Sequence, residues 1–154
     1  MASIINADTS DGLKITSDTS GQIDLQSAGS TKATIDTSGN LKFDSGYGSV
    51  ATAYGCRAWV NFNGTGTVAI RASANVSSIT DGGIGRYTVN FTTAMPDANY
   101  STTASAGRNG TGAGGYTVLV SDASAQTASA TNVGVVISTF SYSDSNNVFC
   151  AVFR

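Results

Sequence analysis

Short segments in which apolar and polar residues alternate run along most of this chain, and glycine-rich or aspartate-containing turns separate them. The clearest segment is CRAWVNF at residues 56–62. A period of two residues is that of a β-strand with one face against a core. No stretch of ten residues shows the helical period, so we predict an all-β chain with almost no helix.

The composition changes near residue 50. All three lysines and six of the ten aspartates precede this point, and all five arginines follow it. A length of 154 residues allows one domain of about 100 residues with an appendage. We therefore predict an N-terminal anchor segment at residues 1–10, a repetitive β stem at 11–50 and a β-sandwich head at 54–154.

The predicted stem contains a nine-residue repeat. Its units are DGLKITSDT from Asp11, SGQIDLQSA from Ser20, GSTKATIDT from Gly29 and SGNLKFDSG from Ser38. The second and fourth units match best, with a Ser-Gly step, then a polar residue, and then an apolar, a charged and an apolar residue. This pattern predicts short strands joined by tight turns with positive φ angles.

Each repeat offers few apolar side chains for burial. At about 1.5–3 kcal/mol per buried side chain, one copy cannot offset an ordering cost of about 1–2 kcal/mol per residue. We therefore predict an intertwined homotrimer in which the apolar side chains of three copies meet. These side chains are Leu13, Ile15, Ile23, Leu25, Ile35, Leu41 and Phe43. The alternative is a disordered leader.

The head is expected to contain about seven strands in an antiparallel sandwich or small barrel. They are predicted at residues 56–62, 68–72, 87–91, 100–103, 116–120, 132–142 and 148–153. The last of them is apolar on both faces, so we expect it at the centre of a sheet or at an interface.

Several uncommon sequence words occur in order in the head, namely CRAWVNFNGTGT, NVSSITD, GRYTVNFTTAMPDANY and VFCAVFR. In these words residues 54–154 resemble the C-terminal domain of bacteriophage tail-fibre and minor tail proteins, especially those of marine and cyanobacterial phages. The resemblance implies a virion protein, usually homotrimeric, that is made in the host cytoplasm, attaches to other virion proteins and often recognises the host. It supplies no ligand-contacting residues.

Most enzyme classes are excluded by composition, because the chain has neither histidine nor glutamate. A Ser-His-Asp triad, a Cys-His pair and a histidine metal site are therefore impossible, and we expect no catalytic residue, metal or cofactor. Scattered arginines do not form the basic stripe that binds nucleic acid. No apolar run reaches the roughly 18–20 residues of a membrane span, and the N-terminus lacks a signal pattern, so we expect neither membrane insertion nor secretion.

Five residues are candidates for receptor contact. Trp59 is flanked by polar residues and could stack on a sugar ring, although a strand tryptophan more often packs against protein. Residues 106–115 are predicted to form a glycine-rich loop that carries a cation and an amide, as recognition loops often do. The candidates are Arg57, Trp59, Arg86, Arg108 and Asn109.

Cys56 and Cys150 lie in the first and last predicted strands of the head. A disulfide between them would close a loop of about 95 residues and stabilise the fold by up to about 4–5 kcal/mol. The alternative is a pair of buried thiols that pack as small apolar groups.

Two functions follow from the sequence. One is a trimeric tail fibre or fibre tip that binds a host-surface glycan or outer-membrane protein without catalysis. The other is a capsid decoration or head-fibre protein with an assembly role, located on the capsid surface rather than the tail.

Overall fold

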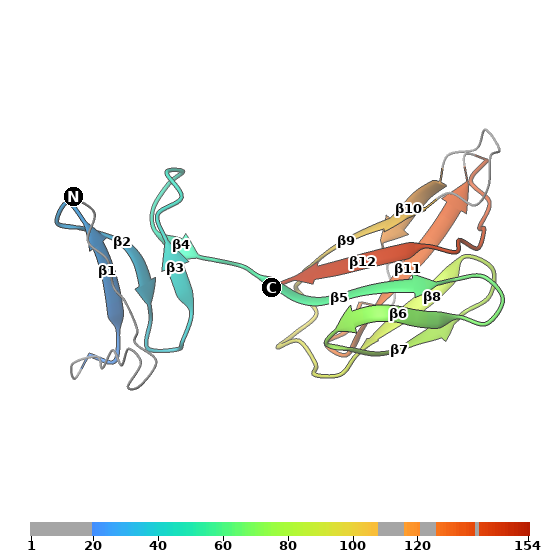
Figure 1. Cartoon of the computed structure of the whole chain (residues 1–154), viewed down its shortest axis with the longest axis horizontal. Coiled ribbons are helices and arrows are strands. Elements are labelled where there is room, and N and C mark those ends of the chain that lie inside the picture. The colour runs from blue at the N-terminus through green and yellow to red at the C-terminus, as the bar shows by residue number, and fades with distance from the viewer. Residues whose placement is uncertain (1–19, 108–115, 121–125, 138) are drawn as a thin grey trace, which may run out of the picture. The chain divides into compact units, whose positions relative to one another are not determined.

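A computed structural model of the chain describes residues 20–107, 126–137 and 139–154, and the backbone of residues 116–120. Within these residues every regular element is a β-strand (Figure 1), which confirms the all-β prediction. None of the described residues forms a helix that could cross a membrane. The chain divides into two compact units, Met1–Ala53 and Tyr54–Arg154.

The first unit holds a four-stranded antiparallel sheet in the order β1-β2-β3-β4. The strands are β1 (Ile23–Ser27), β2 (Ser30–Ile35), β3 (Leu41–Phe43) and β4 (Ala51–Thr52). The strands predicted in the second and fourth nine-residue repeats are thereby confirmed. The first repeat, which contains Leu13 and Ile15, lies outside the described residues. Ala28 and Gly29 join β1 to β2 with φ angles of 52° and 73°, as in a two-residue type I′ hairpin.

The two faces of this sheet differ in chemistry. Residues paired across antiparallel strands lie on the same face. The pairing places Ile23, Ile35 and Leu41 in one row and Leu25, Ala33 and Phe43 in the next. The opposite face carries polar residues, among which Thr34 Oγ1 donates a hydrogen bond of 2.8 Å to Asp24. The sheet is therefore amphipathic, with a continuous apolar face.

The described residues of the second unit form two four-stranded antiparallel sheets. The β5 sheet has the order β6-β5-β12-β9, and the β8 sheet has the order β10-β11-β8-β7. The first comprises β5 (Cys56–Asn63), β6 (Ala69–Ala74), β9 (Ser101–Ala106) and β12 (Val148–Phe153). The second comprises β7 (Val76–Asp81), β8 (Arg86–Phe91), β10 (Tyr116–Val120) and β11 (Ala130–Ile137). The C-terminal β12 pairs with β5 on one side and β9 on the other, which confirms its predicted central place.

Both sheets contribute to one hydrophobic core. The β5 sheet supplies every second residue of its central strands, including Val60, Phe62 and Val148. The β8 sheet supplies Tyr87 and Val89 in the same way, and the Tyr87 ring meets the Phe62 ring edge to face at 5.1 Å between centroids. Because inward residues alternate with outward ones, each central strand also presents side chains on the outer face.

Two strand predictions were wrong. The strand β7 was missed because its two inward residues, Val76 and Ile79, are three positions apart. A register shift beside Ser77 makes this possible, since a β-bulge adds one residue to the strand and breaks the period of two. The strand predicted at residues 132–142 is β11, which ends at Ile137 before a turn in which Phe140 has a φ of 59°.

Candidate functional site

A shallow groove of about 430 Å³ lies on the outer face of the β5 sheet. We call it the Trp59 groove. Its lining is formed by outward side chains of three neighbouring strands and by the residues that alternate with them along each strand. The outward side chains are Trp59 and Asn61 of β5, Phe149 and Ala151 of β12, and Thr103 and Ser105 of β9.

The strand register explains the shape of the groove. Ala151 lies opposite Trp59 on one side and Thr103 on the other, and the next row along the strands is Asn61, Phe149 and Ser105. The small side chain of Ala151 leaves a hollow beside the indole of Trp59. The side chains of Trp59 and Phe149 are 42% and 41% exposed, so both rings are accessible from solvent.

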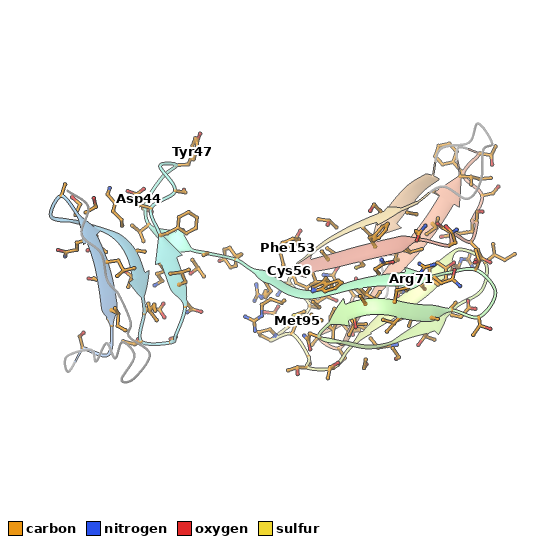
Figure 2. The ribbon with its side chains drawn as sticks, in the orientation of Figure 1. Asp44, Tyr47, Cys56, Arg71, Met95 and Phe153 are labelled. Carbon is orange, nitrogen blue, oxygen red and sulfur yellow. The ribbon has the colours of Figure 1, made fainter. Side chains whose placement is uncertain are left out.

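Polar groups without charge border the two rings. The amide of Asn61 accepts a hydrogen bond of 3.5 Å at Oδ1 from Nη1 of Arg71, which lies on β6 (Figure 2). Thr103 and Ser105 add hydroxyl groups on the β9 side. None of the described residues that line the groove carries a carboxylate. The rings and the polar groups can therefore hold a ligand by stacking and hydrogen bonds.

Cys150 is the titratable residue among the described lining residues, and its thiol belongs to the hydrophobic core beneath the groove. Burial, and secondarily the neighbouring Cys56, raises the pKa of this thiol to about 12. A thiol with such a pKa stays protonated at neutral pH, and it is a poor nucleophile in that form. Cys150 therefore serves as a small apolar core residue.

The three predicted receptor contacts that the structure describes do not converge on one site. Trp59 lies in the groove, whereas Arg57 is the extra residue of a bulge between β5 and β12 and does not line it. Arg86 belongs to the β8 sheet, where its guanidinium carbon lies 4.2 Å from the centre of the Tyr142 ring. Arg108 and Asn109 lie outside the described residues.

Sequence reasoning missed most of the groove. Phe149 was recognised as one of the apolar residues of the last strand, but nothing in the local pattern indicated which residues would lie beside it. Thr103 and Ser105 come from a strand without large apolar residues, STTASA. Only the pairing of β12 with both β5 and β9 brings these residues to Trp59.

The structure contains no bond between the two cysteines that were considered for a disulfide. Both cysteines are free thiols, Cys56 exposed and Cys150 buried. Along β12 the partner of Cys56 is Phe153, and the partner of Cys150 is Val60, so the two cysteines are not opposite each other. Figure 2 shows Phe153 beside Cys56. The alternative expectation was two buried thiols. It holds for Cys150, which is buried, but not for Cys56, which is exposed.

A second polar cluster lies in the turn before β12 and has a structural role. The carboxylate of Asp144 accepts a hydrogen bond of 2.7 Å from the backbone N–H of Gly85. The hydroxyl of Ser145 donates one of 2.6 Å to the carbonyl of Gly107. The described part of the chain contains no group of three or more Cys, His, Asp or Glu side chains that could hold a metal ion.

No family model, no curated protein and no solved structure matches this chain. The resemblance to phage tail-fibre domains therefore stays a prediction that depends on the sequence words quoted above.

Proposed function

We propose that this chain is a structural protein of a phage virion, a homotrimeric tail fibre or fibre tip. In this proposal the first unit is a stem that joins three copies and attaches to other virion proteins. The second unit is a β-sandwich head that binds a receptor on the host surface without catalysis.

The observation that carries the proposal is the uncovered apolar face of the first sheet. Leu25, Ile35, Leu41 and Phe43 share this face and keep 44–50% of their surface exposed. Among the described residues 20–53, Thr34 alone is buried. A small sheet without a core is not stable by itself in water, and a contiguous apolar patch marks an interaction surface. Further copies of the same face would bury it, and the number three comes from the resemblance.

The head is suited to binding in several copies. Its groove exposes aromatic and polar groups together, and a single shallow groove of this kind binds weakly. Three heads joined by one stem would raise the apparent affinity by about 10²–10⁴, provided that they engage the same cell surface. Adhesion would then need no strong single contact.

The test begins with the mass of the purified full chain in solution, measured by light scattering. We expect the mass of a trimer, and a lower mass for Phe43→Asp because a carboxylate would be buried on the apolar face. Thr52→Asp is the matched control, since the pairing of Thr52 with Lys42 places it on the polar face. This control should keep the mass of the wild type.

The second measurement is adsorption of the fluorescently labelled chain to a panel of cyanobacterial and other marine bacterial strains. Saturable binding to some strains, weakened about 10²–10⁴-fold in a monomeric Phe43→Asp variant, supports the proposal. A monomeric wild type would contradict the trimeric stem. Binding to purified capsids but to no strain would favour the capsid decoration or head-fibre role.

A further inference from the structure

We propose that the Trp59 groove binds one neutral sugar ring of a host-surface glycan, an inference that rests on the receptor-binding function proposed above. The ring would stack on Trp59 over Ala151, and its hydroxyl groups would bond to Asn61, Thr103 and Ser105.

The aromatic pair provides the stacking surface. Trp59 and Phe149 are diagonal neighbours on one face of β5 and β12, and such neighbours lie about 7–8 Å apart. Ala151, and Ala74 on the other side, are the cross-strand partners of Trp59, so small side chains flank the indole. This arrangement leaves the indole accessible to a flat apolar surface, which the C–H face of a pyranose ring offers.

The polar groups suit sugar hydroxyls. The hydroxyl groups of Thr103 and Ser105 can donate and accept hydrogen bonds, as sugar hydroxyls do. Arg71 occupies the acceptor end of the Asn61 amide, which directs the amide so that its Nδ2 end can donate to a ligand. Because none of the described residues that line the groove is charged, a neutral sugar fits it better than a charged one.

The position of the groove argues against a peptide strand as the ligand. A peptide that extends a sheet pairs with the free backbone of an edge strand. The groove extends over β5, β12 and the edge strand β9, but its two aromatic rings lie on β5 and β12, which already have partners on both sides. A ligand that stacks on these rings therefore meets side chains and not a free strand edge. The described lining residues include no carboxylate, which also favours binding over hydrolysis, since most glycosidases use a pair of carboxylates.

The groove differs from an interface between copies of the chain. A stable interface buries about 800 Å² of each partner, and it is depleted in charged residues, serine and alanine. Here an amide and two hydroxyl groups lie directly beside the two rings. A small polar ligand can satisfy all of them, which a second apolar surface could not do.

The chain contains a single tryptophan, so its fluorescence reports on this groove directly. We would titrate the full chain with maltohexaose, mannohexaose and galactohexaose, and with the surface polysaccharide purified from a strain that the labelled chain binds. We expect a saturable shift of the Trp59 emission with at least one of these probes. Calorimetry should show at least tenfold weaker binding for Trp59→Ala.

Two further variants separate loss of the groove from loss of the fold. Ala151→Phe fills the hollow while it keeps the tryptophan, and it should weaken binding as much as Trp59→Ala does. Phe140→Ala removes an aromatic ring that is 90% exposed elsewhere on the same unit, and it should bind as the wild type does. Thermal unfolding of each variant shows whether the fold is kept.

Three results would overturn the inference. One is an emission spectrum that no probe changes. Another is adsorption to cells that Trp59→Ala and Ala151→Phe leave intact, in which case the adhesive function stands and the groove is not its site. The third is a concentration-dependent emission shift without sugar together with a lower mass of Trp59→Ala, which identifies an interface between copies. Failure of the wild type to bind any strain would instead contradict the proposed function, and the oligosaccharide titration would still test the groove.

Discussion

The phenol oxygen of Tyr87 lies 3.0 Å from a carboxylate oxygen of Asp144, although 57 residues separate them in the chain. The same phenol donates a hydrogen bond of 2.7 Å to the carbonyl of Gly64. Burial, and then the nearby Asp144 carboxylate, raises the pKa of Tyr87 well above its usual range, so the phenol stays protonated. One side chain of the core thus connects β8 to the turn after β5 and to the turn before β12.

Replacing Tyr87 with phenylalanine should lower the free energy of unfolding by about 1–3 kcal/mol, because the carbonyl of Gly64 would lose its buried donor. Urea denaturation of the full chain measures this change. Tyr54→Phe is the matched control, since Tyr54 is 70% exposed and should tolerate loss of its hydroxyl. Equal stability of the two variants would show that the Tyr87 hydrogen bonds contribute nothing net.

Gly85 and Gly83 should respond differently to alanine. Both have a positive φ, 64° and 98°, which costs an L-residue about 1–2 kcal/mol. A methyl group at Gly85 would also lie 2.6 Å from the Ser143 nitrogen and the Val135 carbonyl oxygen, whereas no atom lies within 4 Å of one at Gly83. We expect Gly85→Ala to destabilise the second unit by about 3–5 kcal/mol, which few single substitutions reach, and Gly83→Ala by only the backbone cost. Similar denaturation midpoints would refute the tight packing at Gly85.

The two thiols should differ in reactivity towards a thiol-specific reagent at pH 8. Cys56 is exposed and should react in the folded protein, whereas Cys150 is buried with a pKa of about 12 and should react only after unfolding. Mass spectrometry should therefore count one modification in the native protein and two in urea without a reductant. A protein that takes up no label in urea would instead contain the disulfide. Cys56→Ser identifies the reactive site.

Removal of Lys42 should weaken the stabilisation that the ionised Asp36 gives to the turn between β2 and β3, and Asp36 should then take up its proton at a higher pH. The carboxylate of Asp36 pairs with Lys42 Nζ at 2.9 Å and accepts hydrogen bonds from the backbone of Asn40 and Ser38. These contacts hold the pKa of Asp36 far below its usual value, and the contact with Lys42 makes the largest contribution. The stabilisation that Asp36 contributes is therefore complete above a pH of about 4, which is the pKa of an aspartate in the unfolded chain. It is lost as the pH falls towards the lower pKa of Asp36 in the folded protein.

A carbon-13 NMR titration of the Asp36 carboxyl group tests this expectation. Lys42→Met should raise the pKa of Asp36 and move the acid unfolding of the first sheet to a higher pH. Lys32→Met, which removes the partner of Asp44 at 3.0 Å instead, is the control and should leave the Asp36 pKa as it is. An Asp36 pKa that is equal in wild type and Lys42→Met would contradict the assigned cause.

The local pattern of the sequence determined the strand class and much of the strand placement. Alternation in CRAWVNF and in the Ile23-Asp24-Leu25 repeat predicted strands that the structure has, because side chains of a strand point to opposite faces whatever its partners are. The alternation also indicated that apolar side chains of the first sheet would gather on one face, since the apolar-charged-apolar pattern recurs in successive repeats. The composition excluded histidine chemistry without any structure.

The tertiary structure decided which strands are neighbours and in what register. The bulge beside Ser77 hid β7, and the register of β12 separated the two cysteines and placed Phe149 between Asn61 and Ser105. Register depends on backbone hydrogen bonds and core packing between segments far apart in the chain. A local pattern of side chains contains no information about such pairs. The sequence could therefore point to Trp59, while only the folded sheet shows the groove beside it.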